Sequence, residues 1–239
     1  MRRRPTRRPG PRTRTRSPNG GEGPKLSRAF LDRFGGRSDR REEDEGGPSG
    51  FPSRSPVVVG LGNPGRSYER TRHNAGYLVV EELARRHSGS WRSKKKAEAA
   101  PVGLGLKNVT LLKPTTYMNN SGSALAGYRV EDLIVVHDDL DLPPGDVRVK
   151  IGGGAGGHNG LRSIINNFGN DFVRVRIGIG RPPEGARITV TDYVLGRMDS
   201  AVKDAVTTAA DAVEAVVENG PEWAMNRFNV RPRTEPPPP

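Results

Sequence analysis

Short apolar runs recur through the middle of the chain and predict β-strands. Runs of β-branched and aliphatic residues at 57–59, 109–112 and 133–136 are typical of buried strands. Residues 147–151 and 173–177 alternate apolar and basic side chains, which also predicts strands. We therefore expect at least five strands.

Helical spacing of apolar residues separates these strands. Residues 78–84 give one apolar face, and Gly89 is a plausible end for that helix. Residues 161–168 follow the i, i+3, i+4, i+7 pattern, so a second helix begins directly after the glycine-rich segment 152–157. Backbone amides at the start of that helix could meet a negative charge.

A third helix is predicted over residues 202–216, with Asp199 or Ser200 as its N-cap and Gly220-Pro221 at its end. Strands that alternate with helices indicate an α/β domain whose sheet is covered on both faces. With 239 residues and 33% hydrophobic content, the chain is long enough for one sizeable core. We expect a single domain with tails.

The two ends of the chain differ in composition from its middle. Residues 1–55 are rich in Arg, Pro, Gly and Ser and predict a disordered basic extension, with a possible amphipathic turn at 26–34. This extension carries fifteen Lys or Arg and seven Asp or Glu, a net charge of +8 out of +12 for the chain. The predicted domain covers residues 56–230, and residues 231–239 form a Pro-rich tail.

Charge and cysteine content limit the classes of function. A net charge of +12 and a pI near 10.5 favour a polyanionic partner. Cysteine is absent, which excludes disulfides, thiol catalysis and thiolate zinc sites. No apolar run approaches the ~20 residues that span a bilayer, so we expect a soluble cytoplasmic protein with no membrane partner.

His73 is the first candidate for chemistry. It lies in the segment TRHNAG, shortly after GLGNPG at the end of the first predicted strand. An imidazole titrates near neutral pH and can act as a general base. A single histidine near a helix start is more commonly a capping or packing residue, so His73 needs an orienting carboxylate to support a catalytic interpretation.

Asp138 is the best such carboxylate. It follows the strand at 133–136, at the carboxyl end where ligands tend to bind in open α/β sheets. Turn formation before Pro143-Pro144-Gly145 explains Asp138, Asp139 and Asp141 equally well. A divalent metal is a third interpretation, but neither a His-x-x-His spacing nor an acidic ligand spacing supports it.

Three asparagines next to turn residues, Asn63, Asn119 and Asn159, carry amides that can donate to an oxyanion. Turn formation explains any one of them. The segment 152–157 resembles a phosphate-binding loop but lacks the Lys-Ser/Thr pair, and Pro64 interrupts the first glycine segment. We therefore expect no nucleotide cofactor.

Two groups of basic residues suit phosphate. Lys150 and Arg176 lie on successive predicted strands and could converge on one phosphate, although spacing alone favours solvated charges on a strand face. Residues 94–96, with Arg92 and Trp91, form an exposed basic cluster that suits contact with a nucleic-acid backbone but is more commonly a solvated loop.

Six segments taken together resemble the bacterial type of peptidyl-tRNA hydrolase. They are GLGNPG, TRHNAG, PTTYMNNSG, HDDLDLPPG, GGGAGGHNGL and RVRIGIGRP, and the similarity extends over residues 56–228. The resemblance implies a monomeric single α/β domain with a twisted mixed sheet. It also implies an enzyme without cofactor or metal, which hydrolyses the ester between a peptide and the tRNA 3′ ribose and recovers tRNA stalled by premature release from the ribosome.

The resemblance further implies roles for individual residues. His73 would activate water, and Asp138 would orient His73. The residues implied to bind substrate are Asn63, Met118, Asn119, His158 and Asn159 in the cleft, Tyr68 at the tRNA 3′ end, and Lys150 with Arg176 around the tRNA 5′ phosphate. Ester hydrolysis of this kind needs a positioned water, a base and an oxyanion donor, but no covalent nucleophile.

The extension at 1–55 departs from the family, whose members usually begin close to the first strand. Its acidic run at 42–45 fits an organellar transit peptide poorly, and we expect an auxiliary contact with the ribosome or other RNA. Family relatives that act as non-catalytic RNA-binding splicing factors provide the alternative function, although every expected active-site residue is present here. The sequence leaves open whether a helix near 141–147 moves over the cleft.

Overall fold

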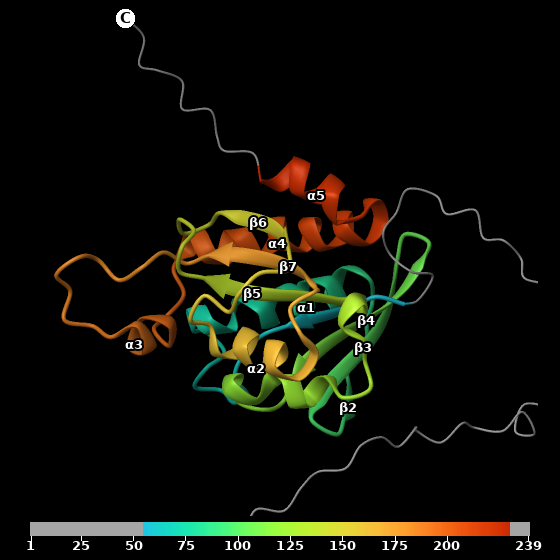
Figure 1. Ribbon diagram of the computed structural model, residues 1–239, viewed down its shortest axis with the longest axis horizontal. Coiled ribbons are helices and arrows are strands. Elements are labelled where there is room, and N and C mark those ends of the chain that lie inside the picture. The colour runs from blue at the N-terminus through green and yellow to red at the C-terminus, as the bar shows by residue number, and fades with distance from the viewer. Residues whose placement is uncertain (1–54, 230–239) are drawn as a thin grey trace, which may run out of the picture. The chain divides into compact units, whose positions relative to one another are not determined.

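The structure is a computed structural model that describes residues 55–229. Apart from Ser55, the predicted extension with its turn at 26–34 lies outside the described residues, as does the predicted tail at 231–239. Within the described range, a seven-stranded mixed sheet has helices on both faces, which confirms the predicted fold class (Figure 1).

The sheet has parallel strands at its centre and antiparallel pairs toward its edges. Its order is β2-β3-β4-β1-β5-β7-β6. Neighbours among β4, β1, β5 and β7 are parallel, whereas the pairs β2–β3, β3–β4 and β6–β7 are antiparallel. The strands are β1 (Val57–Gly60), β2 (Arg92–Lys94), β3 (Ala97–Leu104), β4 (Lys107–Pro114), β5 (Leu133–Asp139), β6 (Val147–Ile151) and β7 (Val173–Gly178).

Helices of both α and 3-10 type connect and cover these strands. The α-helices are α1 (Ala75–Arg86), α2 (Asn159–Phe168), α3 (Val190–Val194), α4 (Ser200–Asn219) and α5 (Pro221–Phe228). The 3-10 helices are η2 (Arg72–Asn74), η3 (Met118–Leu125) and η4 (Val130–Asp132). In the described part of the chain, no helix combines the length and apolar character needed to cross a membrane.

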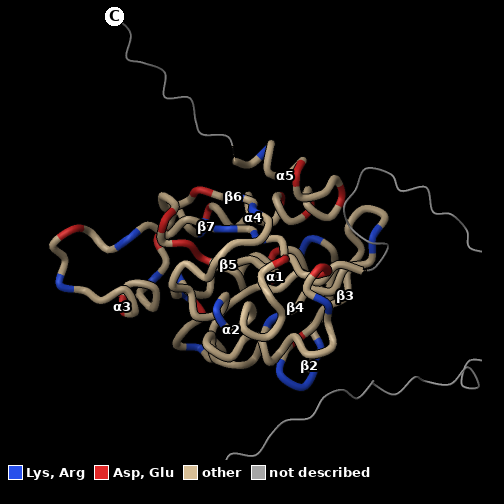
Figure 2. The backbone as a smooth tube through the Cα atoms, viewed as in Figure 1, with Lys and Arg blue, Asp and Glu red and all other residues tan. Residues whose placement is uncertain are grey.

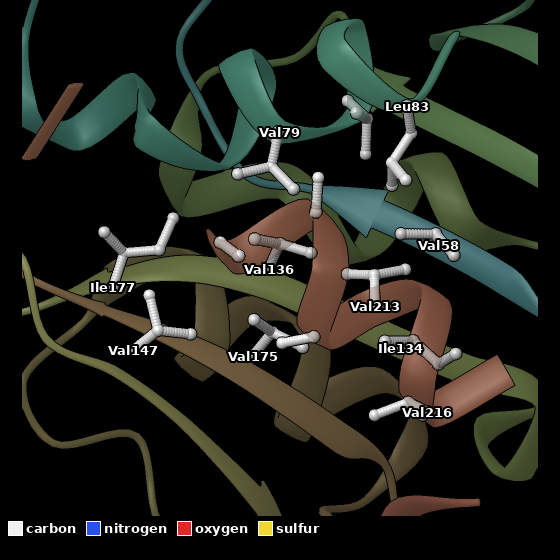
Figure 3. Close-up of a cluster of buried hydrophobic side chains, with 14 of the residues drawn as sticks. Val58, Val79, Leu83, Ile134, Val136, Val147, Val175, Ile177, Val213 and Val216 are labelled. Atoms are coloured by element: carbon white, nitrogen blue, oxygen red, sulfur yellow. The ribbon is translucent and has the colours of Figure 1, made fainter. Parts of the chain in front are cut away.

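Apolar side chains pack on both faces of the sheet. On one face, Val58 and Val136 pack with Val79 of α1 and Val213 of α4 (Figure 3). The other face is covered by α2 and η3. Each buried aliphatic side chain of this size contributes about 1.5–3 kcal/mol relative to exposure. Because side chains alternate along a strand, β5 holds helices on both of its faces.

Two glycines allow α1 to approach the sheet closely. A Cβ atom on Gly60 would overlap the main chain of Gly76, and a Cβ atom on Gly76 would overlap the carbonyl oxygen of Val136 and the main chain of Leu61. The first turn of α1 therefore rests directly on the ends of β1 and β5. The helix η2, which immediately precedes α1, is held at the same edge.

The expected basic loop at 94–96 is instead part of the β2–β3 hairpin, which the sequence patterns missed. Lys95 occupies the turn with a φ of 45°. Pro101 and several alanines weaken the strand signal of β3, so pairing with β4 decides its conformation. The lysines remain exposed on this edge hairpin, as expected (Figure 2), whereas Trp91 packs partly buried against the core.

The region around Gly220-Pro221 ends α4 as predicted, but it also begins α5, which was not predicted. Asp199 caps α4, because its side chain accepts a hydrogen bond from the N–H of Val202 at 3.1 Å. Pro221 occupies the first turn of α5, where no N–H donor is needed. Between β5 and β6, residues 140–146 form turns and not a helix.

Replacing Gly76 by Ala should lower the free energy of unfolding by about 1–3 kcal/mol, because the added methyl group forces α1 away from β1 and β5. Urea unfolding measures this change. Gly103→Ala is the matched control, since a Cβ atom there meets nothing within 4 Å, and its effect should stay within about 0.5 kcal/mol. Equal effects of the two substitutions would show that the close approach does not limit packing.

Candidate active site

Two histidines and one aspartate meet at the carboxyl end of β5. His73 lies in η2, between β1 and α1, and Asp138 is the penultimate residue of β5. His158 is the N-cap of α2. Since α1 and α2 cover opposite faces of the sheet, their amino-terminal ends converge where β5 stops. The sheet topology therefore brings together three residues that lie far apart in the sequence.

The carboxylate of Asp138 accepts hydrogen bonds from both imidazoles. His73 Nδ1 lies 3.0 Å from each carboxylate oxygen, and His158 Nε2 lies 3.0 Å from Oδ1. The Nδ1 atom of His158 accepts from the N–H groups of Gly160 and Leu161. His158 therefore carries its proton on Nε2 and donates it toward Asp138. In the same way, His73 donates from Nδ1, which leaves its Nε2 as a free acceptor.

Burial and charge act in opposite directions on this group. Burial opposes protonation of His73, which is 8% exposed, but the attraction and hydrogen bond of Asp138 outweigh it and raise the pKa of His73 above 6.5. Burial likewise opposes ionisation of Asp138, yet His73 and His158 hold the pKa of its carboxyl below the usual range. Asp138 therefore stays ionised, and its charge favours the protonated form of His73.

His137 is a third imidazole in this region, and the sequence patterns gave it no role. Its Nδ1 lies 2.7 Å from the main-chain oxygen of Asp138, and its ring meets that of His158 edge-on at 5.2 Å. Burial, followed by the nearby His158, lowers the pKa of His137 to about 3. His137 is therefore a neutral packing partner of His158 and does not compete with His73 for protons.

A cavity of about 360 Å³ opens beside the Asp138 group. Six of the ten residues singled out from the sequence line it: His73, Asp138, Lys150, His158, Asn159 and Arg176. The glycine-rich segment, at 154–157, forms part of its wall. Acidic and basic segments meet at this end of β5 and β7 (Figure 2). The cavity thus connects the imidazole–carboxylate pair to a group of cations.

Lys150 and Arg176 lie on paired strands, as expected, but they are not opposite each other. Lys150 on β6 pairs with Arg174 on β7, whereas Arg176 pairs with Arg148. Arg176 Nε donates to Asp139 Oδ2 at 2.8 Å, and Lys150 is exposed. The two side chains line the same cavity from different positions along the paired strands.

Asn63 and Met118 are hydrogen-bonded to each other, but neither residue lines this cavity. Asn63 Oδ1 accepts from the N–H of Met118 at 2.8 Å, so its Nδ2 group remains a donor. Asn74, next to His73, fixes Asn63 further, because its side chain bonds the N–H and the carbonyl of Asn63 at 2.9 Å each. Asn74 was not among the predicted site residues, although its position directly after His73 was a signal.

The three remaining predicted residues are at least partly exposed. Asn119 is exposed on η3, beside Met118. Tyr68 is half-buried and meets the ring of Tyr117 edge-on at 6.4 Å. Asn159 begins α2, is exposed, and accepts from Arg162 at 2.8 Å. Neither Asn119 nor Tyr68 lines the cavity.

Arg72 is a further residue that sequence reasoning missed. It precedes His73, and its guanidinium lies 4.4 Å from the centre of the Tyr193 ring. It also donates to the main-chain oxygen of Tyr193 at 3.2 Å. These contacts tie η2 to α3, across more than a hundred residues. No local pattern in the sequence indicates such a pairing.

The His73, Asp138 and His158 side chains are also the group, within residues 55–229, that could present ligands to a metal ion, with ligand atoms within 4.8 Å of one another. In this group, His73 Nδ1 and His158 Nε2 already donate their protons to Asp138. A metal ion would have to replace both protons, because metal-binding nitrogens must be deprotonated. The donor set therefore fits a hydrogen-bonded acid–base group better than a metal centre.

An imidazole with one nitrogen fixed by a buried carboxylate and the other free is suited to activating water. Its place at the carboxyl end of an α/β sheet, beside a cavity lined by both basic and acidic side chains, indicates a hydrolase that acts on a charged substrate.

Comparisons with known proteins define the family. The sequence model of the family described as Peptidyl-tRNA hydrolase matches residues 57–236. A peptidyl-tRNA hydrolase of Rubrobacter xylanophilus is 69% identical over 173 residues, which cover 72% of this chain and 99% of that protein. The crystal structure of peptidyl-tRNA hydrolase from Acinetobacter baumannii has a TM-score of 0.67 and 38% identity, and the match covers 74% of this chain and 95% of that one. The chain belongs to the peptidyl-tRNA hydrolase family.

The pKa of His73 should lie above 6.5 and fall below 6.5 in Asp138→Asn, because burial persists while the attraction of the carboxylate is lost. An NMR titration of the imidazole resonances, assigned with single His→Gln variants, measures both values. His137 should keep the signals of a neutral ring down to a pH near its pKa of about 3. An unchanged His73 pKa in the Asn variant would contradict the electrostatic coupling.

Proposed function

We propose that the protein hydrolyses the ester bond between the peptide and the tRNA 3′ ribose of peptidyl-tRNA, releasing free tRNA and peptide after premature drop-off from the ribosome. The buried pair of His73 and Asp138 is the observation that carries this proposal, because both residues line a cavity that can hold substrate. Membership of the family supports the choice of substrate.

His73 acts as the general base in this proposal. Its Nε2 removes a proton from water as the water oxygen attacks the ester carbonyl carbon, which forms a tetrahedral oxyanion. Asp138 holds the ring through Nδ1 and stabilises the imidazolium. Collapse of the intermediate breaks the bond to the ribose 3′ oxygen, and the imidazolium returns its proton to that oxygen. No metal or covalent nucleophile takes part.

The asparagine amides and three further residues are proposed to bind the substrate. Nδ2 of Asn63 is free to donate to the developing oxyanion or the peptide, since its Oδ1 is engaged by Met118. The amides of Asn119 and Asn159 hold the peptide or the water. The further residues assigned to binding are Met118 and His158 in the cleft and Tyr68 at the tRNA 3′ end.

Lys150 and Arg176 are proposed to hold the tRNA 5′ phosphate. Both line the cavity, and one supplies a point charge while the other supplies a planar fork. Arg176 is already paired with Asp139. When phosphate binds, Arg176 either releases Asp139 or contacts Asp139 and the phosphate together. Contacts to phosphate carry no sequence information, which suits an enzyme that must accept many tRNAs.

The remaining assignments concern the whole chain. We propose that the enzyme works as a cytoplasmic monomer, because its substrate arises from translation and a single copy supplies the whole pair of His73 and Asp138. We also propose that the basic extension at 1–55 contacts the ribosome or other RNA, since it carries +8 of the net charge of +12.

His73→Ala should reduce single-turnover hydrolysis of N-acetyl-aminoacyl-tRNA by about 10²–10⁴-fold, the usual contribution of a general base. The assay is run with a chelator, and unacetylated aminoacyl-tRNA is the substrate control. His87→Ala is the matched control, because His87 pairs with Glu214 outside the site and should leave the rate unchanged. Wild-type protein that binds tRNA without cleaving the blocked ester would point to the non-catalytic RNA-binding alternative. Loss of activity with chelator would refute the metal-free mechanism.

Binding of tRNA with and without a 5′ phosphate separates the two proposed RNA contacts. Lys150→Ala should abolish the preference for the 5′ phosphate, whereas Lys203→Ala, on the exposed face of α4, should preserve it. Deleting residues 1–54 should weaken binding and flatten its salt dependence, by a slope of roughly 0.7–0.9 for each lost phosphate contact. A truncated protein with unchanged affinity and salt slope would exclude the extension as an RNA contact.

A further inference from the structure

Arg174 is a buried arginine that points into the glycine-rich segment. Its side chain lies on β7, and the residue is 3% exposed. Nη1 donates to the carbonyl oxygen of Gly154 at 2.6 Å, and Nη2 donates to the carbonyl oxygen of Gly153. A guanidinium can bind two adjacent carbonyls in this way because its donors form a rigid planar fork.

The Arg174 side chain is itself held by a contact with the ring of Phe172. Its guanidinium lies 4.6 Å from the centre of the Phe172 ring, and Phe172 is fully buried. The carbonyl of Phe172 also accepts from the N–H of Gly152 at 2.9 Å. Phe172, just before β7, and Arg174 on β7 therefore hold three successive glycines of the segment.

The glycine-rich segment needs such support. Four of its glycines have positive φ values, which glycine adopts without strain: 64° at Gly152, 102° at Gly153, 55° at Gly156 and 82° at Gly157. Because glycine has no side chain, contacts from other residues must hold these conformations in place. The segment leads directly to His158, whose N–H donates to Ala155 at 2.8 Å. Movement of the segment would move the imidazole that donates to Asp138.

Arg174 also sets the direction of two amide donors in the cavity wall. In a trans peptide the C=O and N–H groups point in opposite directions. Holding the carbonyls of Gly153 and Gly154 toward Arg174 therefore turns the N–H groups of Gly154 and Ala155 away from it. Both residues line the cavity.

Arg174 and Arg176 lie on the same face of β7 but have different partners. Both residues line the cavity, and Arg176 is paired with the carboxylate of Asp139. Two donor groups of Arg174 bind main-chain carbonyls. Burying a guanidinium next to another cation costs free energy, and hydrogen bonds to the buried group offset that cost. The contacts of Arg174 are those of a support for the main chain.

We propose that Arg174 is a positioning residue, which clamps the carbonyls of Gly153 and Gly154 and thereby holds His158 and, through it, the Asp138 carboxylate that orients His73. The inference rests on the proposed hydrolase function of the same site. Arg174 acts on the chemical step and not on the affinity for RNA, in contrast to Lys150 and Arg176.

Arg174→Lys and Arg174→Gln test this inference by steady-state hydrolysis of N-acetyl-aminoacyl-tRNA. Lysine keeps the charge but loses the fork, so both variants should lower kcat by about 10- to 100-fold, as expected for a displaced catalytic group. KM and the Kd for deacylated tRNA should stay within about twofold, with the same salt slope. The NMR signal of the His158 Nε2 proton should weaken or shift. Arg85→Lys, on the exposed face of α1, is the matched control.

Two results would overturn the inference. One is a Lys variant with wild-type kcat. The other is a Gln variant that raises KM and reduces the salt slope while kcat is kept, which would make Arg174 an RNA contact. Unfolding curves check the stability of each variant. If the Arg174 variants fail to fold, Phe172→Leu decides, because removing the aromatic support should lower kcat in the same direction without changing KM. Absence of hydrolysis by the wild type would refute the proposed function instead.

Discussion

The buried carboxylate of Asp138 is the group on which the rest of the site depends. An ionised carboxylate with little access to water must be satisfied by donors, and here two imidazoles from opposite faces of the sheet satisfy it. This requirement fixes the tautomers of His73 and His158 together. It also leaves the second nitrogen of His73 as the only unengaged atom with acid–base function in the group.

The fold meets this requirement by placing helix starts at one point. Gly60 and Gly76 allow α1 to pack closely against the sheet, and His73 in η2 therefore lies at the end of β5. On the other face, the glycine-rich segment before α2 delivers His158, and Arg174 supports that segment from β7. Close packing of the main chain, and not the length of the side chains, sets the geometry of the acid–base group.

Charge is divided between functions in the same region. Acidic groups at the end of β5 have partners within the protein, since Asp138 binds imidazoles and Asp139 binds Arg176. The cations of β6 and β7 differ in exposure: Arg174 is buried, whereas Lys150 is exposed. Positive charge therefore lies in the same cavity as His73. Burial lowers the pKa of this imidazole, but the attraction and hydrogen bond of Asp138 outweigh burial and raise that pKa.

The sequence by itself determined the strands at the centre of the sheet, the long helices and the segments that carry the site, because their apolar periodicity and glycine punctuation are local. The hairpin β2–β3 and helix α5 were missed, since pairing with β4 and packing on α4 outweigh weak local patterns. Only the tertiary structure decided that His158 shares Asp138 with His73, and that Arg174 rather than Arg176 holds the glycine-rich segment. Contacts between residues distant in the chain depend on strand order and register, which a local pattern does not specify.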